Sequence, residues 1–458
     1  MAYKISDESR LARNQKVKDR QKETRERRKS QDTKVVTLKL DRSRMLPATL
    51  HTITNMYKEA RYLYNYILST AEPYNKKKSE EYFALRDALA ESMKEQFPNT
   101  KDILKEKKFI EEFKKVREGL KDTEKTENPI FTFSDKTVDI KIKTKEGFED
   151  RKLEFLPAKL RQSIIAGLKT SVYALSQAIK KGIKIGRLKY IKTLDTLTFT
   201  QVNMDFILNE IPYTEERSID KPKYRIKLLG IKQHLYVQGS YQLPNEYELA
   251  GNAKLIRSGN DFYIALTICT PKEVQKRNDK VVGLDYGIST AITTSDGKKY
   301  GVKIEESDRL KKLQRKMARQ ERFSHNWYKT KNKIQKEYRK AVDKKSNFAN
   351  RIVSTLDKKY GTIIMQDENL VGWQHGRFGK QVGSSALGAI KAKLKNNPKT
   401  VFVSRYASTT QVCSNCGHKL LTKLELSDRL FVCPECGYTE DRDINAAKSI
   451  KNIGLATK

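Results

Sequence analysis

The stretch "VVGLDYGISTAITTSDGKKYGVKI", residues 281–304, contains three short apolar runs separated by small and polar residues. The first run ends directly at Asp285. The second and third are joined by Asp296 and Gly297, a dipeptide typical of tight β-hairpins. The pattern predicts a meander of three short strands, with the Asp285 carboxylate at the end of the first.

The segments that follow this meander alternate between helical and strand patterns. A long basic helical region extends to about Leu356, and the run "GTIIMQDENL" (361–370) has the composition of a buried strand. A helix around 386–394 and a strand "TVFVSR" (400–405) complete the series. A three-strand meander followed by alternating helices and strands is the order of the RNase H-like α/β fold. A fold does not by itself give a function, so the function has to be argued from side chains.

Acidic residues lie at the ends of three of these expected elements. Asp285 ends the first strand, Glu368 or Asp367 follows the second apolar run, and Asp443 opens a final helix, "INAAKSIKNI". Each acid alone also fits an ordinary role, as a turn residue, a solvated strand end or a helix N-cap. Hydrolysis of a phosphodiester by the two-metal route needs acidic side chains that hold the ions about 4 Å apart, and Mg²⁺ prefers oxygen ligands. Their joint placement predicts a Mg²⁺-dependent nuclease site with two ions.

Four of the five cysteines form two Cys-x2-Cys pairs separated by sixteen residues, each followed by glycine. These cysteines are Cys413, Cys416, Cys433 and Cys436. The spacing predicts a four-cysteine ribbon that holds one structural Zn²⁺, with a redox dithiol as the alternative. Four thiolates complete a tetrahedral shell, so His418 is not expected to be a ligand. Cys269, in an apolar run, is expected to be a small buried hydrophobic residue.

The ribbon ends shortly before the third acid. A metal ion that closes this loop would deliver the residues beyond Cys436 to a fixed place. We therefore expect the ribbon to position Asp443 beside Asp285 and the middle acid.

The chain of 458 residues has 93 Lys and Arg against 56 Asp and Glu, a formal net charge of +37. Such a charge opposes compaction unless a polyanion neutralises it, and nucleic acid is the obvious one. No apolar run approaches the roughly 20 residues of a membrane-spanning helix, and the N-terminus has no apolar signal core. We therefore expect a cytosolic protein that binds nucleic acid and not membrane.

The basic helical region combines cations with aromatic residues. Lys312, Arg315, Arg319 and Arg322 are spaced to fall on one helical face, and His325, Trp327 and Tyr328 follow. This combination suits phosphate binding and base stacking on a single strand. A solvated basic face with a tryptophan in the core is the alternative.

The N-terminal part shows a basic arm, a helical block and a β-rich segment. The arm, residues 1–34, has almost no apolar content and is expected to be flexible or to form a helix on RNA or DNA, with a solvated tail as the alternative. A strand is expected from Val35 to Leu40. After about Tyr190 short alternating runs, including "AKLIRSGNDFYIALTI" (253–268), predict a small β-barrel or sheet that the strand at Val35 could complete.

The C-terminal motifs resemble those of transposon-encoded TnpB proteins and the miniature type V CRISPR effector nucleases. The resembling stretches are "GLDYGI" for the first acid of a RuvC-type site, "IIMQDENL" for the second, "CSNCG" with "CPECG" for the ribbon and "DRDINAAKSI" for the third acid. Clear resemblance covers about Val281 to Ile453. The second acid of that family is commonly a Glu followed by Asp or Asn and Leu, which selects Glu368. Asp367 is the reserve, and counting from the strand end could instead select Gln366, which cannot serve as a carboxylate.

The resemblance implies an RNA-guided DNA endonuclease of the prokaryotic cytosol. Such a protein binds a guide RNA, recognises a short motif flanking the target and cleaves target DNA at a single RuvC-like, Mg²⁺-dependent site, here Asp285, Glu368 and Asp443. Whether it acts as a monomer or as a homodimer on one RNA stays open. A guided DNA-binding protein without cleavage and a transposase or recombinase with the same fold are the alternatives.

The expected architecture is multidomain α+β. It comprises a basic arm (1–34), a wedge-like β-barrel (35–45 and 190–280) with an inserted helical recognition domain (46–189), a RuvC-like nuclease domain (281–408 and 441–458) and a zinc ribbon (409–440).

Overall fold

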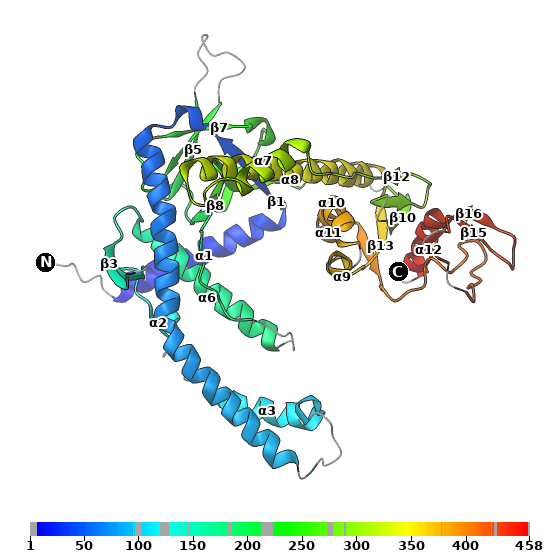
Figure 1. Cartoon of the computed structure of the whole chain (residues 1–458), viewed down its shortest axis with the longest axis horizontal. Helices are drawn as coiled ribbons and strands as arrows, with labels where there is room; N and C mark the ends of the chain where they lie inside the picture. The colour runs from blue at the N-terminus through cyan, green and yellow to red at the C-terminus, as the bar shows by residue number, and fades with distance from the viewer. Residues whose placement is uncertain are drawn as a thin grey trace, which may run out of the picture. The chain divides into compact units, whose positions relative to one another are not determined.

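The chain forms two compact units in a computed structural model, residues 1–272 and 273–458 (Figure 1). The structure describes residues 7–94, 96, 103–119, 128–144, 146–180, 186–211, 223–272, 278–287, 290–376, 378–422, 424–425 and 428–456. Within these ranges, no helix is both long and apolar enough to cross a membrane.

The first unit is built on a seven-stranded antiparallel sheet. Its strands, in spatial order, are β4 (Thr196–Phe199), β8 (Glu248–Ser258), β9 (Asp261–Pro271), β1 (Gln31–Leu40), β7 (Leu235–Gln238), β6 (Tyr224–Leu228) and β5 (Phe206–Glu210). β1 lies between β9 and β7, so the strand before the helical block joins the strands after it. It begins at Gln31 and not at Val35 as predicted, because the first four residues pair with the end of β9.

The turn predicted at Ser258–Asp261 is confirmed, because these two residues pair as the last rung between β8 and β9. Among the described residues no pairing joins β4 to β5, the two outer strands. The expected closure of this sheet into a barrel therefore stays a prediction.

The first unit also contains five described helices and three short 3-10 turns. The helices are α1 (Asp7–Lys29), α2 (Pro47–Lys94), α3 (Lys107–Gly119), α5 (Pro129–Thr132) and α6 (Ala158–Lys180), with short 3-10 turns η1 (Arg42–Arg44), η2 (Ile103–Lys105) and η3 (Ser240–Gln242). Ile53, Tyr57 and Ala60 of α2 are buried in the core, and the Tyr57 hydroxyl donates a hydrogen bond to the Leu255 carbonyl of β8 at 2.8 Å. A hairpin of β2 (Asp139–Lys143) and β3 (Phe148–Lys152) in the helical block was not predicted.

The basic arm is helical over α1, and nearly all its described side chains are exposed. Its ordering on RNA or DNA stays a prediction. Cys269 is 2% exposed within β9, which confirms the prediction of a small buried residue.

The second unit contains a five-stranded sheet with both antiparallel and parallel pairs. Its spatial order is β12 (Lys299–Tyr300), β11 (Ile292–Thr294), β10 (Val281–Tyr286), β13 (Thr362–Gln366) and β14 (Thr400–Val403). The three-strand meander predicted for residues 281–304 is confirmed, with antiparallel pairing of β10 to β11 and β11 to β12. β13 and β14 follow in parallel, so the ends of β10 and β13 lie at the same edge of the sheet.

Six helices are described in the second unit. They are α7 (Asp308–Ala318), α8 (His325–Lys359), α9 (Leu370–His375), α10 (Gly379–Ser384), α11 (Leu387–Lys395) and α12 (Arg442–Ala456). Side chains alternate along β13: Ile363 and Met365 belong to the core formed with α8 and α11, whereas Ile364 packs with Ile450 of α12. The sheet is therefore enclosed between α8 with α11 on one face and α12 on the other.

α12 lies unusually close to β10. A Cβ atom placed on Gly283 would lie 2.0 Å from the carbonyl oxygen of Ala447 and 2.8 Å from the backbone nitrogen of Lys451. Only glycine permits this approach, which brings the N-terminus of α12 beside the end of β10.

We predict that Gly283→Ala lowers the free energy of unfolding of the full-length protein by about 1–3 kcal/mol, the usual cost of overpacking a close contact. The backbone of α12 cannot yield as a flexible side chain would. Gly388→Ala is the matched control, because that glycine lies exposed in α11 with nothing within 4 Å of its would-be Cβ. The control should gain up to about 1 kcal/mol from helix propensity. Equal denaturant midpoints for the two variants would contradict the prediction.

Candidate carboxylate site and four-cysteine cluster

Asp285 is the next-to-last residue of β10, opposite Thr293 of β11. Burial, and next the neighbouring Asp443 carboxylate, raise the pKa of Asp285 to about 8. Glu368 adds to this effect, whereas Arg442 opposes it. Since electrostatic effects of this kind act over short distances in a protein, Asp443 and Glu368 both lie near Asp285.

Two adjacent acids after β13 have different surroundings. Asp367 accepts a hydrogen bond from the Lys391 ammonium at 2.5 Å and lies 3.6 Å from Arg405, and these cations lower its pKa. Glu368 is half-buried, and burial raises its pKa. The Glu368 carboxylate is also one of the groups that raise the pKa of Asp285. The geometry therefore favours Glu368 over Asp367 as the second acid.

Gln366 has a structural role. Its amide nitrogen donates hydrogen bonds to the carbonyl oxygens of Ser404 at 3.1 Å and Ala407 at 2.9 Å, and its amide oxygen accepts one from the Thr409 hydroxyl at 3.3 Å. The buried Gln366 side chain thus fixes the segment after β14 to the end of β13.

Asp441, and not Asp443, caps the last helix. Its Oδ1 accepts hydrogen bonds from the backbone nitrogens of Asp443 at 3.0 Å and Ile444 at 3.2 Å, and its Oδ2 pairs with Lys299 of β12 at 2.7 Å. Asp441 therefore fills the N-cap role, which was the alternative explanation for Asp443. The Asp443 carboxylate lies in the first turn of α12, 3.7 Å from the Nε of Arg442.

The four predicted cysteines come together. Their four Sγ atoms all lie within 4.8 Å of one another. The Sγ–Sγ distance is 3.8 Å between Cys413 and Cys436 and 3.6 Å between Cys416 and Cys433. Gly417 and Gly437 have φ values of 80° and 69°, the left-handed conformation that lets each knuckle turn its two thiols inward. This arrangement could hold a zinc ion.

Within the described residues, the cysteines are the one group of three or more potential ligands close enough to share an ion, and His418 is outside it. The three acids do not form a second group of this kind. Their association rests on the electrostatic effects at Asp285.

α12 is hydrogen-bonded directly to the first knuckle. The fully buried Asn445 side chain accepts from the Ser414 backbone nitrogen and donates to the Val412 carbonyl, both at 2.9 Å. Ser449 also donates to the Val412 carbonyl at 3.0 Å, and Asn452 donates to that of Ser414 at 2.9 Å. The sequence analysis did not identify Asn445, although it stands two residues after Asp443. A short strand pair, β15 (Leu430–Val432) with β16 (Thr439–Asp441), links the second knuckle to the start of α12.

The predicted single basic helical face is wrong. Lys312 and Arg315 lie on α7, but that helix ends at Ala318, so Arg319 is its C-cap and Arg322 lies in the connection to α8. The break arises because Ser324 caps α8 by accepting from the Trp327 backbone nitrogen.

Aromatic rings gather at this connection. Trp327 is half-buried, its ring centroid lies 5.2 Å from that of Tyr328, and the Lys331 ammonium lies 5.1 Å from it. Phe323, which the sequence analysis missed, is 68% exposed and has a φ of 70°. A non-glycine residue in this conformation is uncommon and marks a segment held by its surroundings.

The fold and site thus define an α+β protein of two units with a four-cysteine cluster beside three acids. Residues 264–370 match the family model OrfB_IS605, described as a probable transposase, and residues 388–450 match the Cas12f1-like TNB domain. These matches confirm the resemblance to TnpB proteins and miniature type V effectors.

Two curated relatives carry the name "Putative RNA-guided DNA endonuclease". The relative from Streptomyces pristinaespiralis is 29% identical over 186 residues, which are 38% of this chain and 45% of the relative. The second, InsQ of Escherichia coli (strain K12), is 26% identical over 235 residues, 45% of this chain and 57% of the relative. The chain therefore spans about half the length of the curated relatives it matches. Among solved structures, a Cas12f1–sgRNA–target DNA complex has 12% sequence identity and a TM-score of 0.47, covering 92% of this chain and 99% of that chain.

We predict that Asn445→Leu lowers the free energy of unfolding by about 2 kcal/mol or more, because it leaves the Ser414 N–H without its acceptor and removes one of the two donors to the Val412 carbonyl. The change should also speed loss of metal from the cysteine cluster to a chelator. Asn452→Leu, at an exposed position of the same helix, is the control and should cost well under half as much. Denaturant unfolding and a zinc-release assay measure both effects. Comparable losses for the two variants would show that the Asn445 bonds are not the main attachment.

Proposed function

We propose that this protein is an RNA-guided DNA endonuclease that cleaves target DNA at a single site formed by Asp285, Glu368 and Asp443. The observation that carries the proposal is that Asp443 and Glu368 both raise the pKa of Asp285, although the three acids come from three separate segments of the second unit. The names of the two curated relatives support it. So does the net charge of +37, which favours a polyanionic partner.

The proposed nuclease domain has an RNase H-like, RuvC-type fold. The sheet order of the second unit supports this, because a three-strand antiparallel meander continues into two parallel strands with helices on both faces. The proposed domain limits are residues 281–408 with 441–458 for the nuclease, 409–440 for the ribbon, 35–45 with 190–280 for a wedge-like β-barrel and 46–189 for the helical recognition domain.

The acids suit divalent metal ions. Carboxylate oxygens are the ligands that Mg²⁺ prefers, and the pKa of Asp285 is raised first by burial and then by the negative charges of Asp443 and Glu368, which cations would offset. Asp285, Glu368 and Asp443 would hold them, and two bound Mg²⁺ ions would activate water and stabilise the leaving oxygen. The chain supplies positions for the ligands: the strand end of β10, the turn after β13 and the first turn of α12.

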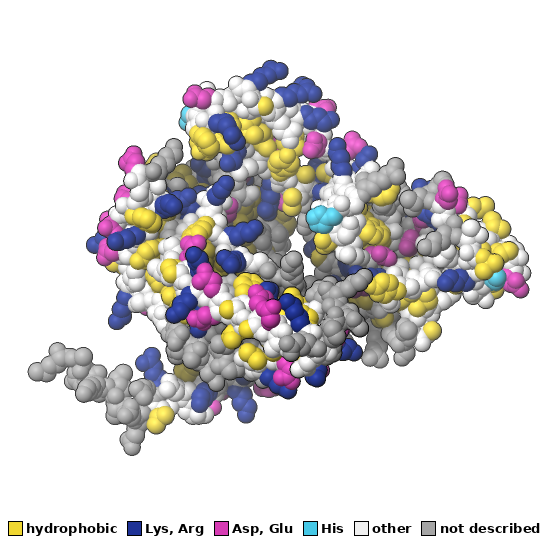
Figure 2. Space-filling view, turned by 60° about the horizontal axis from the view of Figure 1, so that its bottom comes forward, with side chains coloured by type: hydrophobic (Ala, Val, Ile, Leu, Met, Phe, Trp, Pro, Cys, Tyr) yellow, Lys and Arg dark blue, Asp and Glu magenta, His cyan; other side chains and the backbone are white. Residues whose placement is uncertain are grey.

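Guide RNA and target DNA are the proposed partners. Lys312, Arg315, Arg319 and Arg322 are all exposed, and together with Trp327 they offer cations and a stacking ring to a strand even though they do not share one helical face. Figure 2 shows Lys and Arg side chains spread over the visible face, which suits a partner with a large footprint.

The proposed role of Zn²⁺ is structural. Four thiols fill a tetrahedral shell and leave no open position for a substrate or water. The ion would hold the two knuckles together, and Asn445 of α12, which is hydrogen-bonded to the first knuckle, would then fix the position of Asp443.

We predict that Asp285→Asn, Glu368→Gln and Asp443→Asn each reduce cleavage of a matched plasmid by about 100-fold or more, because each removes a charged metal ligand worth several kcal/mol. The assay uses protein co-purified with its own RNA, Mg²⁺ and a target preceded by a randomised flank. Asp367→Asn is the matched control and should retain most activity, since that acid is paired with Lys391 and Arg405.

The same assay separates the alternatives. A wild-type protein that binds the matched target without cutting it would be a guided binding protein. Joining of the cut ends to a second DNA would indicate a transposase or recombinase, in line with the description of one matching family model. Loss of activity in Asp367→Asn but not Glu368→Gln would overturn the choice of the second acid.

We predict that the purified protein contains about one zinc per chain and that Cys416→Ser abolishes this content. Because the cluster fixes α12, the variant should lower the melting temperature of the second unit and its cleavage activity together. Cys269→Ser is the control and should leave zinc content unchanged. Metal analysis with differential scanning calorimetry tests this, and a full zinc content in Cys416→Ser would refute the four-cysteine assignment.

A further inference from the structure

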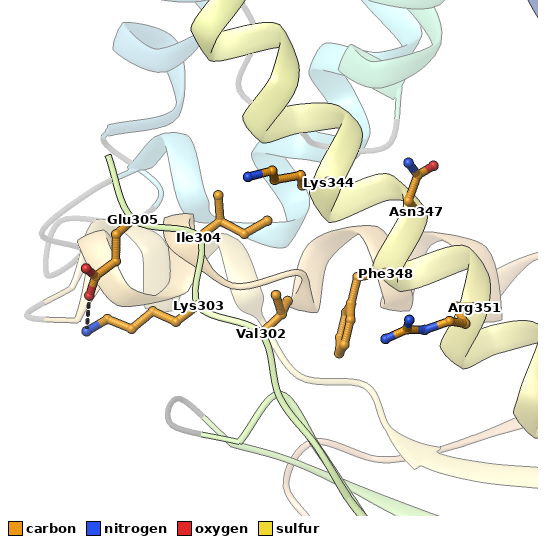
Figure 3. A pocket seen from close by; sticks show the side chains of 8 residues that line it. All are labelled: Val302, Lys303, Ile304, Glu305, Lys344, Asn347, Phe348 and Arg351. Carbon is orange, nitrogen blue, oxygen red and sulfur yellow. Dashed lines mark ion pairs between the residues drawn. The ribbon is translucent and has the colours of Figure 1, made fainter. Parts of the chain in front are cut away.

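A groove of about 560 Å³ lies in the second unit between α8 and the segment that follows β12 (Figure 3). Val302 and Ile304 form one wall, and Lys344, Phe348 and Arg351 line the other. The first wall is held in place by a hydrogen bond from the Ile304 backbone nitrogen to the Ser384 carbonyl at 3.2 Å. The volume is within the range of sites that bind small molecules, about 300–1,000 Å³.

An aromatic ring lies at the centre of the helical wall. Lys344, Phe348 and Arg351 are four and three residues apart, so they share one face of α8. Phe348 is half-buried and packs against the core of the second unit together with Val302, which fixes its ring. The ring points into the space between α8 and Val302, and the Arg351 guanidinium extends toward it, 6.0 Å from the ring centroid.

The groove carries uncompensated positive charge. At its rim Lys303 and Glu305 neutralise each other in an ion pair of 2.8 Å. In the described part of the chain Lys344 and Arg351 have no acidic partner, and both are exposed. The Phe348 ring therefore lies between two cations, Lys344 one helical turn before it and Arg351 one turn after it. This arrangement matches a ligand that has a planar ring with an anionic group on either side.

We propose that this groove binds one nucleotide of an unpaired strand, with its base against Phe348 and its flanking phosphates on Lys344 and Arg351. A base within a duplex is already stacked on both faces, so a lone ring in a groove favours a base that is free. The inference rests on the proposed function and deepens it, because it assigns a binding site for unpaired nucleic acid outside the three acids. The strand is either DNA or RNA, because both present a base and flanking phosphates to the groove.

The test is equilibrium binding of fluorescent oligonucleotides to the full-length protein with Asp285→Asn, which prevents cutting. Single-stranded DNA, single-stranded RNA and duplex DNA are compared at several salt concentrations. Phe348→Leu, which keeps apolar volume against the core, should weaken binding of one or both single strands by about 5- to 100-fold, and Phe348→Trp should restore it. Replacing Lys344 and Arg351 together by Gln should reduce the slope of log K against log salt by about 1.4, or 0.7 per phosphate.

Tyr338→Leu is the matched control, because Tyr338 is an exposed aromatic residue of the same helix outside the groove. Its binding should equal that of the parent protein. The proposal is overturned if Phe348→Leu binds single strands like the parent, if Tyr338→Leu weakens binding equally, or if duplex binding falls as much as single-strand binding. This binding assay needs neither guide RNA nor cleavage. If the wild-type protein never cuts DNA, that result refutes the proposed function but leaves the proposed nucleotide site to be judged by the binding assay.

Discussion

The position of α12 depends on the buried Asn445 side chain, which joins this helix to the first cysteine knuckle. Both of its hydrogen bonds go to backbone atoms, of Ser414 and Val412, so they fix the knuckle's backbone and not merely a side chain. On its other side α12 is pressed onto β10 at Gly283. The helix is thus held between the sheet and the knuckle. These two contacts together fix the position of Asp443, which lies two residues before Asn445 in the same helix. The four-cysteine cluster is thereby coupled to the position of Asp443 through α12.

The two acids after β13 show why adjacent residues of the same charge have different roles. Asp367 is paired with Lys391 and Arg405. These cations stabilise its charged form but also occupy its carboxylate oxygens. Glu368 has no such partner at hydrogen-bond distance among the described side chains, and its charge acts on Asp285 instead. Lys391 and Arg405 also lower the pKa of Glu368, but within the described part of the chain their ion pairs are with Asp367. The ion pairs of Asp367 therefore support its neighbour as the ligand.

Much of the second unit could be predicted from sequence because its signals are local. The meander depends on short apolar runs and an Asp-Gly turn, and the cluster on the spacing of cysteine pairs. The continuous basic face could not be predicted correctly, because the spacing of Arg319 and Arg322 continues the helical period across a break set by the capping of Ser324. Asn445 was missed, and the structural role of Gln366 was not predicted, for a related reason. Their roles depend on backbone atoms more than 30 residues away, and no local pattern encodes those partners.

The carboxylate site is held together against its own electrostatics. Asp443 and Glu368 both disfavour the charged form of Asp285, and Arg442 offsets only part of this effect. No attraction among the acids could assemble such a site, so its geometry must come from the framework: parallel pairing of β10 and β13, the close contact at Gly283, and the knuckle bonds of Asn445. Stability in these parts is the physical condition for bringing the three acidic groups together, and a bound cation would offset the repulsion between them.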